Sequence, residues 1–326
     1  MSVVITGAAG YIGSLLAKKL TDKGIDVICV DNLTRGDYSY LSKYKSRRLR
    51  LLVEDIRYKD RLEHVFKEFS NLEAIIHLAA IPGLDRCRKD PENAILTNVY
   101  GTYNVLELAR KYDVKKVVFT SSAAVYGTPT KTPITEDHPL NPLNLYGVTK
   151  LAAENLLISY HKNYGLKTVI LRFGNVYGVG LYTYWETVIP KFVKQALCDE
   201  PLTIYGSGQQ ARDFIHIYDI IQAIELALEA DKKASGEIFN VASGKPISIN
   251  HVADITSEVM REKFGKSIKR VYLPPRKGET FVKDFSLSIK KIKAKLKFKP
   301  KFSIKDGIIQ LINYYIQTEK LKISGG

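Results

Sequence analysis

Residues 3–20 read VVITGAAGYIGSLLAKKL, in which a short β-branched run, three glycines and an amphipathic segment follow one another. The pattern Gly7-x-x-Gly10-x-x-Gly13 is weak by itself, but a strand before it and a helix after it strengthen it. Gly7 permits a tight turn, Gly10 lets a pyrophosphate approach the backbone, and Gly13 lets the helix pack close to the sheet. The stretch therefore predicts a turn whose N–H groups, at the positive end of a helix, bind the phosphates of a dinucleotide.

The first 170 residues continue in the same way, with short β-branched runs alternating with segments of helical periodicity. This alternation is typical of βαβ units, whose right-handed crossovers build a Rossmann-type, doubly wound parallel sheet with helices on both faces. The expected strands are Val3–Thr6, Asp26–Val30, Leu49–Val53, Ala74–His77, Val117–Ser121 and Thr168–Leu171. The expected helices include Tyr11–Lys23, Asn93–Tyr112 and Tyr146–Tyr164. Ligands of such sheets bind beyond the carboxyl ends of the strands.

After about residue 175 the alternation becomes irregular and turn-rich. We expect a dinucleotide-binding domain over residues 1–175 and a second, smaller α/β domain, which binds substrate, over most of residues 176–326. The segments Phe214–Ile217 and Ile238–Val241 could be strands that return to the main sheet, so residues 213–242 are expected to belong to the first domain as well.

The second expected strand ends at Asp31, 18 residues after Gly13. A carboxylate there accepts hydrogen bonds from an adenosine ribose and repels a 2′-phosphate, which favours NAD over NADP. Arg35 follows closely and leaves NADP open. Asp55-Ile56 and Leu78-Ala79-Ala80 follow the third and fourth strands, and in this topology both segments end at the cofactor.

The fifth strand ends in Ser121-Ser122, which puts hydroxyls at the carboxyl edge of the sheet. Tyr146 and Lys150 come later, four residues apart at the start of a predicted helix, and therefore share a face. A nearby ammonium and a positively charged nicotinamide would both lower the pKa of a phenol from its usual value of about 10. Tyr-x-x-x-Lys alone is mostly surface decoration, but the glycine loop, Asp31 and the strand-end serines before it make it a catalytic pair.

These segments, in this order, resemble the extended short-chain dehydrogenase/reductases, specifically the nucleotide-sugar epimerase/dehydratase family, over essentially the whole chain. The segments that carry the resemblance are GAAGYIG (7–13), VDNLTRG (30–36), EDIR (54–57), HLAA (77–80), NVYGT (98–102), SSAAVYG (121–127), Tyr146 with Lys150, RFGNVYG (172–178), RDFIH (212–216) and PPRKGE (274–279). The resemblance implies that Ser122, Tyr146 and Lys150 are the catalytic residues, and that Asn98 orders an active-site water and the helix near Lys150. It implies NAD as the cofactor, bound by Gly7, Gly10, Tyr11, Ile12, Gly13, Asp31, Asn32, Asp55, Ile56, Leu78, Ala79, Ala80, Asn98, Ser121, Tyr146, Lys150 and Phe173.

Ala123-Ala124 distinguish between branches of this family. Dehydratases carry an Asp-Glu pair at these positions, and decarboxylating relatives carry a Glu at the second. Two alanines offer no proton-transfer group, so the chain resembles most closely the UDP-glucose 4-epimerase branch, which interconverts UDP-glucose and UDP-galactose and would place the chain in galactose metabolism. The alternatives are a 4-epimerase of UDP-glucuronate or UDP-N-acetylhexosamines, a dehydratase, dehydrogenase or reductase of nucleotide sugars, and an inactive cofactor-bound sensor. The intact Ser122, Tyr146 and Lys150 set weighs against the sensor.

The resemblance also implies a set of substrate-binding residues. Asn175 matches the asparagine that binds the substrate diphosphate, and Arg212 and Arg276 match two nucleotide-binding arginines. Glu279 matches an acid that contacts the uridine ribose. The remaining expected substrate contacts are Ser122, Ala123 and Tyr146. Two departures bear on the sugar: Lys283 stands where a Tyr or a smaller residue is common, and so either prefers an acidic sugar or points to solvent, and residues 180–186 (GLYTYWE) are atypical.

Composition excludes several other classes of function. The net charge of +15 comes largely from residues 288–305, where Ile289, Ile292 and Leu296 fall at helical spacing and lysines fill the rest, as expected for a solvated helix followed by an extended segment. No nucleic-acid motif accompanies the lysines, so we expect no nucleic-acid partner.

The remaining expectations concern the cell and the assembly. The N-terminus lacks the pattern of a signal peptide, and no apolar stretch approaches the roughly 20 residues that cross a bilayer, so we expect a cytoplasmic protein without membrane contact. Three scattered cysteines and six dispersed histidines predict neither disulfides nor a metal site. By resemblance only, we expect a homodimer formed through helices 93–112 and 146–164.

Overall fold

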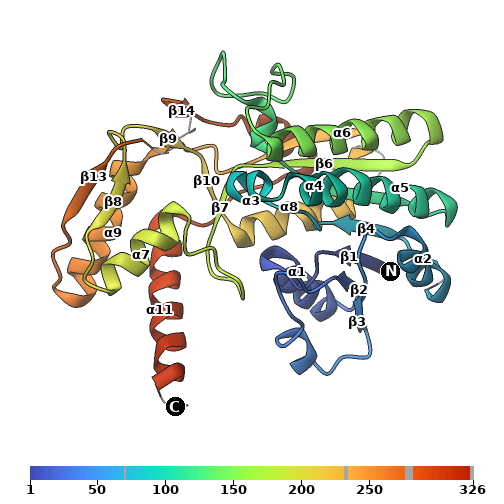
Figure 1. The fold of residues 1–326 in the computed structure, drawn as a ribbon, viewed down its shortest axis with the longest axis horizontal. Helices are drawn as coiled ribbons and strands as arrows, with labels where there is room; N and C mark the ends of the chain where they lie inside the picture. The colour runs from blue at the N-terminus through green and yellow to red at the C-terminus, as the bar shows by residue number, and fades with distance from the viewer. Residues whose placement is uncertain (70, 231–233, 276–281, 324–326) are drawn as a thin grey trace.

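The computed structural model describes residues 1–69, 71–230, 234–275 and 282–323. Seven parallel strands form its main sheet in the order β11-β6-β5-β4-β1-β2-β3 (Figure 1). The strands are β1 (Ser2–Thr6), β2 (Asp26–Asp31), β3 (Leu49–Val53), β4 (Ala74–His77), β5 (Lys116–Ser122), β6 (Lys167–Phe173) and β11 (Glu237–Val241). The strand order reverses between β1 and β4, which is the switch point at which doubly wound sheets bind ligands. The predicted fold class and the six predicted strands are confirmed.

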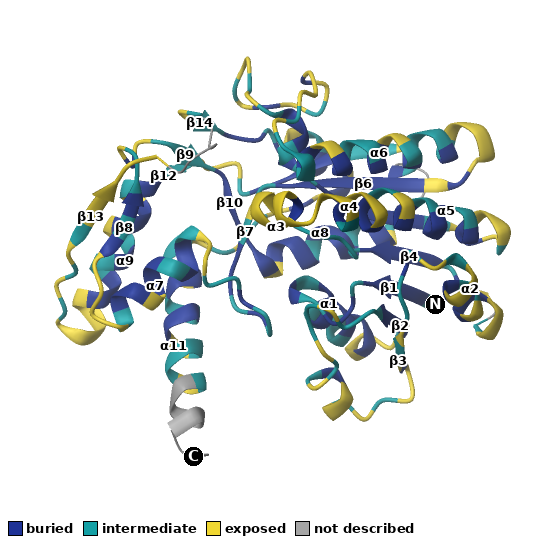
Figure 2. Cartoon of the chain, in the orientation of Figure 1, coloured by how far each residue is buried: buried dark blue, intermediate teal, exposed yellow. Residues whose placement is uncertain are grey.

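Helices cover both faces of this sheet, as the alternation predicted. Helices α1 (Tyr11–Asp22) and α8 (Ile217–Glu229) share one apolar core with one face of the strands. Helices α2 (Lys59–Glu68), α5 (Gly101–Lys111) and α6 (Leu145–Tyr164) share a second core with the other face. Figure 2 shows the strands of the sheet buried while the outer ends of the helices are exposed. The central strands, buried on both faces, therefore read as continuous apolar runs.

The helix predicted over residues 93–112 is built from three pieces. It begins as α4 (Pro91–Ile95), continues through a π-helical turn over Leu96–Tyr100, and ends as α5. The N-terminus of α4 is capped by Asp90, whose carboxylate accepts a hydrogen bond from the Asn93 N–H. A π-helical turn inserts an extra residue, and such turns often occur at functional sites.

Smaller elements form the rest of the molecule beside the main sheet (Figure 1). Strand β7 (Asn175–Tyr177) pairs with β10 (Phe214–His216), β8 (Leu202–Tyr205) with β13 (Arg270–Leu273), and β9 (Ala211–Arg212) with β12 (Ile247–Ser248) and β14 (Asp284–Phe285). Helices α7 (Val188–Leu197), α9 (Ile249–Phe264) and α11 (Ile304–Ile323) pack around a third core. The short helices are α3 (Leu84–Lys89) and α10 (Lys290–Leu296).

Of the two segments that could return to the main sheet, only one does. Residues 238–241 lie in β11, which pairs with β6. The other possibility was wrong: Phe214–His216 form β10, which pairs with β7 in a separate two-stranded sheet. The position beside β6 is taken by β11, and β10 pairs with β7 instead.

The lysine-rich segment behaves as its spacing predicted. Within α10, the side chains of Ile292 and Leu296 are buried, whereas the lysines between them are exposed. No helix within the described ranges is both long enough and apolar enough to cross a membrane.

Candidate active site

The glycine loop between β1 and α1 is packed so closely against its own backbone and that of the Ala79 segment that Gly7 and Gly13 have no room for side chains. A Cβ on Gly13 would stand 2.2 Å from the Gly7 carbonyl oxygen, and one on Gly7 would stand 2.7 Å from the Ala79 nitrogen. Gly7 also has a φ of +72°, which disfavours any residue with a side chain. The first turn of α1 contains no acidic residue, so no side-chain carboxylate competes for its N–H groups. This loop fits the phosphates of a dinucleotide.

Asp31, at the end of β2, is fixed beside this loop. Its Oδ2 accepts a hydrogen bond of 3.0 Å from the Ala9 N–H, and its Oδ1 accepts one of 2.9 Å from the Leu33 N–H. Burial raises the pKa of the carboxyl, although these two backbone donors and the charge of Arg35 oppose the rise. Each oxygen keeps a lone pair for another donor, so the carboxyl can accept hydrogen bonds from a ribose.

Asp55 is fixed at the end of the neighbouring strand. The Asn32 amide donates to its carboxylate over 2.9 Å, and Arg57 donates to it through its guanidinium. Asn32 and Asp55, both predicted from the resemblance, thus form one hydrogen-bonded pair at the edge of the pocket.

Ser122 ends β5, and Tyr146 and Lys150 lie in the first turns of α6, which Asn144 caps by accepting from the Gly147 N–H. The Ser122 hydroxyl lies near enough to the Tyr146 phenol to lower its pKa, and both side chains line the same pocket. The Lys150 ammonium donates to the Thr120 carbonyl over 2.8 Å, which ties α6 to the end of β5. The structure brings the three predicted catalytic residues together.

The expected lowering of the Tyr146 pKa needs a bound nicotinamide as well as Lys150, so it stays a prediction. Burial raises the pKa of Tyr146 to about 12, against lowering contributions from the Ser122 hydroxyl and the Arg35 charge. Burial also lowers the pKa of Lys150 to about 8. Desolvation penalises the charged form of both groups, and its size depends on packing that residue spacing does not reveal.

Asn98 is hydrogen-bonded both to a residue of the pocket wall and to helix α6. Its amide accepts from the Ile81 N–H over 2.7 Å and donates to the Ile81 carbonyl and to the Thr149 hydroxyl over 3.1 and 3.0 Å. Asn98 lies in the π-helical turn and does not line the pocket. It joins Ile81, which does line the pocket, to Thr149 of the helix that carries Lys150, and its expected contact with a cofactor stays a prediction.

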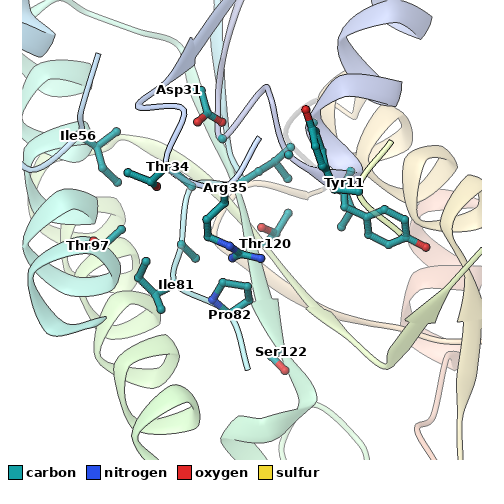
Figure 3. A pocket seen from close by; sticks show the side chains of 18 of the residues that line it. Tyr11, Asp31, Thr34, Arg35, Ile56, Ile81, Pro82, Thr97, Thr120 and Ser122 are labelled. Atoms are coloured by element: carbon teal, nitrogen blue, oxygen red, sulfur yellow. The ribbon is translucent and has the colours of Figure 1, made fainter. Parts of the chain in front are cut away.

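These groups surround one pocket at the carboxyl ends of the strands, with a volume of about 280 Å³. Figure 3 shows Asp31 and Ser122 at its two ends and the Arg35 side chain between them. The predicted residues that line it are Gly7, Gly10, Tyr11, Ile12, Gly13, Asp31, Asn32, Asp55, Ile56, Leu78, Ala79, Ala80, Ser121, Ser122, Tyr146, Lys150 and Phe173. Ala123, Asn175 and Arg212 lie outside its lining, and Arg276 and Glu279 lie outside the described residues.

Two lining side chains, Tyr182 and Tyr184, were not predicted as site residues. They come from the segment after β7, whose atypical sequence was the signal that could have identified them. The Asp37 N–H donates to the Tyr182 hydroxyl over 2.7 Å, and the Arg35 guanidinium donates to the Tyr184 hydroxyl. The segment therefore reaches the loop after β2.

Of the expected nucleotide-binding residues, Arg212 lies on β9 of the three-stranded sheet and Asn175 lies on β7. The Arg212 guanidinium donates to the Ala211 and Val282 carbonyls over 2.9 and 2.8 Å. Lys283 accepts from the Ala211 N–H through its carbonyl, and its side chain is exposed. Of the two readings of Lys283, the structure favours the one in which it points to solvent. Within the described residues, no cluster of three or more His, Cys, Asp or Glu side chains could hold a metal ion.

Comparison with known proteins adds to this geometry. A model of the NAD dependent epimerase/dehydratase family matches residues 3–242. A putative UDP-glucose 4-epimerase of Methanocaldococcus jannaschii is 36% identical over 314 residues, which are 96% of this chain and 97% of that protein.

Solved structures agree over the same length. UDP-glucuronic acid 4-epimerase from Bacillus cereus, in complex with UDP-glucuronic acid and NAD, matches with a TM-score of 0.87 at 32% identity, covering 98% of this chain and 100% of that one. UDP-N-acetylglucosamine 4-epimerase from Methanobrevibacter ruminantium, in complex with UDP-N-acetylmuramic acid, matches with a TM-score of 0.88 at 31% identity, covering 97% and 98%. The names of these proteins agree on position 4 and differ in the sugar.

Proposed function

The chain belongs to the NAD-dependent epimerase/dehydratase family, and on that premise we propose that it is a nucleotide-sugar 4-epimerase that interconverts UDP-glucose and UDP-galactose. NAD is the cofactor of this family, and the glycine loop, Asp31 and the Asn32–Asp55 pair fit it. The reaction and the sugar are the parts that we propose.

The position of the pocket carboxylates supports epimerisation over elimination of water. Among the described residues that line the pocket, the carboxylates are Asp31, Glu54 and Asp55. Asp31 ends β2, and Glu54 and Asp55 follow β3. Ser122 ends β5, and in the sheet the strands β1 and β4 lie between β5 and β2. The positions after Ser122 hold Ala123 and Ala124. Tyr146 therefore has no carboxylate beside it to share acid and base work, and an epimerase needs none.

In the mechanism that we propose, Tyr146 moves one proton in each direction. As phenolate, Tyr146 takes the proton of the C4 hydroxyl through Ser122 and so becomes a phenol, and it later returns that proton to the C4 oxygen of the sugar with inverted configuration. Bound NAD supplies a reversible acceptor for the hydrogen and the electron pair at C4. Lys150, tied to the Thr120 carbonyl, keeps two donor protons for the nicotinamide ribose and stabilises the phenolate by its charge.

The smaller part of the molecule has to hold the nucleotide while the 4-keto sugar turns over. We assign this to residues 176–326, and specifically to Asn175 at its boundary, Arg212, Arg276 and Glu279, with residues 1–175 and 213–242 serving the dinucleotide. A tethered sugar stays at high effective concentration, so return of the hydrogen outpaces escape of the ketone. Arginines suit this task because their planar fork makes paired bonds to phosphate.

Incubation with UDP-galactose, without added NAD, tests the reaction. We expect UDP-glucose to accumulate until both sugars reach equilibrium, with no net reduction of the cofactor. Net reduction or release of a ketose would instead indicate a dehydrogenase or a reductase. A panel with UDP-glucuronate and UDP-N-acetylhexosamines would identify the preferred sugar, and preference for either would correct our choice.

Tyr146→Phe separates an enzyme from a cofactor-bound sensor. The variant lacks only the phenolic oxygen, so it should lose turnover by at least about 100-fold and keep its NAD. Tyr103→Phe serves as the matched control because Tyr103 belongs to α5 and does not line the pocket. Undiminished turnover in Tyr146→Phe would rule out the mechanism.

We further propose a cytoplasmic homodimer. The three cysteines are free thiols, which fits a reducing compartment. We place the dimer interface on the surface formed by α4, the π-helical turn and α6, where apolar side chains are exposed.

A further inference from the structure

Arg35 is a cation that lines the dinucleotide pocket and makes no direct ion pair among the described residues, although its charge is felt by the Asp31 carboxyl. The described ion pairs with a nitrogen–oxygen distance up to 4.0 Å do not include Arg35, and its hydrogen-bond partner is the neutral Tyr184 phenol. The side chain is partly buried, so solvent screens its charge incompletely. A partly desolvated guanidinium that faces a pocket complements an anionic ligand.

Tyr184 holds Arg35 in place and is itself held from three sides. Its ring lies 5.5 Å from the Arg35 guanidinium and 5.2 Å from the Arg86 guanidinium, and it meets the edge of the Tyr11 ring at 5.5 Å. Cations over an aromatic face are attracted to it. Arg35 is thus fixed by a hydrogen bond and by ring contact.

Residues 178–186, which we call the strap, carry Tyr184 across to the loop after β2. The Tyr11 hydroxyl donates to the Gly178 carbonyl over 2.7 Å at one end of the strap. Gly180 packs so closely on Tyr11 that a Cβ there would stand 2.5 Å from the ring. The strap and the first turn of the glycine-loop helix are therefore one packed unit, on which the position of Arg35 depends.

The direction of Arg35 distinguishes between two ligands. An arginine that selects NADP must reach the 2′-phosphate on the adenosine ribose, and that ribose is expected beside Asp31. Figure 3 shows the Arg35 guanidinium directed away from the Asp31 carboxylate and toward Pro82, between Asp31 and Ser122. Its charge also acts on Tyr146, whose pKa it lowers. The guanidinium thus points to the middle of the pocket, between the groups expected to contact the two ends of the dinucleotide.

We propose that Arg35, positioned by Tyr184 of the strap, binds the diphosphate of the dinucleotide together with the N–H groups of the glycine loop, and does not read a 2′-phosphate. The guanidinium and the backbone N–H groups both contribute to binding, because an arginine makes paired, charge-assisted bonds to phosphate oxygens that the backbone donors leave free. The proposal concerns the cofactor site alone, so it stands or falls separately from the choice of sugar and of reaction.

Equilibrium binding to the full chain, freed of nucleotide, tests the proposal. Dissociation constants are measured for NAD, NADP, adenosine diphosphate, adenosine and uridine diphosphate, for the wild type and for Arg35→Gln. We expect Arg35→Gln to weaken NAD, NADP and adenosine diphosphate by the same factor, about 10- to 100-fold, and to leave adenosine unchanged. Arg35→Lys should recover part of the loss, because it restores the charge without the planar fork.

Further variants separate a local effect from a general one. Tyr184→Leu should weaken the same three ligands, and Tyr184→Phe, which keeps the ring, should do so less. Arg48→Gln removes an equal charge from an exposed ion pair with Asp26 and should change nothing. Thermal unfolding of each variant shows whether it is folded before binding is interpreted.

Three outcomes would overturn the proposal. If NADP loses more affinity than NAD, Arg35 reads the 2′-phosphate. If adenosine weakens as much as adenosine diphosphate, or no ligand weakens, Arg35 makes no phosphate contact. If uridine diphosphate weakens while NAD does not, the arginine serves the diphosphate of the substrate.

Discussion

Lys150 carries its charge in the wall of the pocket, where 3% of the residue is exposed. Burial lowers its pKa from 10.5 to about 8, against the charge of Glu154. Because one pH unit corresponds to about 1.4 kcal/mol, keeping this ammonium inside the fold costs about 3 kcal/mol at neutral pH. A side chain that the proposed mechanism requires is therefore a source of instability.

Lys150→Met should raise the free energy of unfolding at pH 7 by about 1–3 kcal/mol, while activity falls by at least about 100-fold. The gain is less than the full penalty because the Thr120 carbonyl loses its donor. Urea unfolding against pH checks the sign. In the wild type the penalty is complete below about pH 8 and is relieved as pH rises from about 8 to 10.5, since only the unfolded chain is protonated there.

The advantage of Lys150→Met should accordingly shrink across that window and vanish above it. Lys283→Met, at an exposed lysine, is the control and should show no such trend. A Lys150→Met protein less stable than the wild type at pH 7 would contradict the argument.

At this scale the sequence predicted which residues meet but not how they titrate. Four-residue spacing puts Tyr146 and Lys150 on one helix face in any α-helix, so their proximity follows from the sequence. Burial depends on how α3 and β5 pack against α6, and it raises the pKa of Tyr146, an effect that residue spacing does not reveal. The sequence shows that Arg35 carries a charge near Asp31, but only the contact with Tyr184 shows where its guanidinium lies.

Helix α6 extends the catalytic face by one more turn to Glu154, which is fully buried. Its carboxylate pairs with Arg172 of β6 at 2.7 Å and accepts from the Ser121 hydroxyl of β5. Arg172, 1% exposed, also donates to the Tyr126 hydroxyl. This pair therefore connects α6 to both strands beneath it.

Glu154→Gln should destabilise the protein by about 3–5 kcal/mol, because it leaves the Arg172 charge buried without a partner. Replacing both residues, Glu154→Leu with Arg172→Met, should cost less than the sum of the single changes. Urea unfolding of the two singles and the double gives the coupling energy. Strictly additive costs would show that the two charges do not compensate each other.

Element positions were predicted well where the chain makes βαβ units and poorly elsewhere. The central strands of such units are buried on both faces, so their apolar runs are long, and most of them pair with a neighbour in sequence. Strand β10 is only three residues long, and its pairing with β7 is not marked by any pattern in its sequence. The strap has no periodicity at all, and its place over the pocket follows from contacts with Tyr11 and Arg35.

The whole molecule leaves one apolar surface on the helices beside the active site. Ile95, Leu96 and Tyr100 are 47%, 40% and 47% exposed, and Val148 on the neighbouring α6 is 47% exposed. Single exposed apolar residues are normal, but several on adjoining helices usually mark an interface. This surface lies on the helices that the resemblance assigns to a dimer.

Ile95→Glu should convert the dimer to a monomer, because it puts a charge at the centre of an interface that is dry in the assembled state. Light scattering on a size-exclusion column should give twice 36.7 kDa for the wild type and 36.7 kDa for the variant. Tyr272→Glu is the matched control, since Tyr272 is 53% exposed on β13, outside this surface, and should leave the dimer intact. A monomeric wild type would refute the dimer, and dissociation by Tyr272→Glu alone would move the interface to the smaller part of the molecule. Because Val148 stands two residues from Tyr146, we also expect dissociation to lower turnover, by loosening the first turn of α6 against β5.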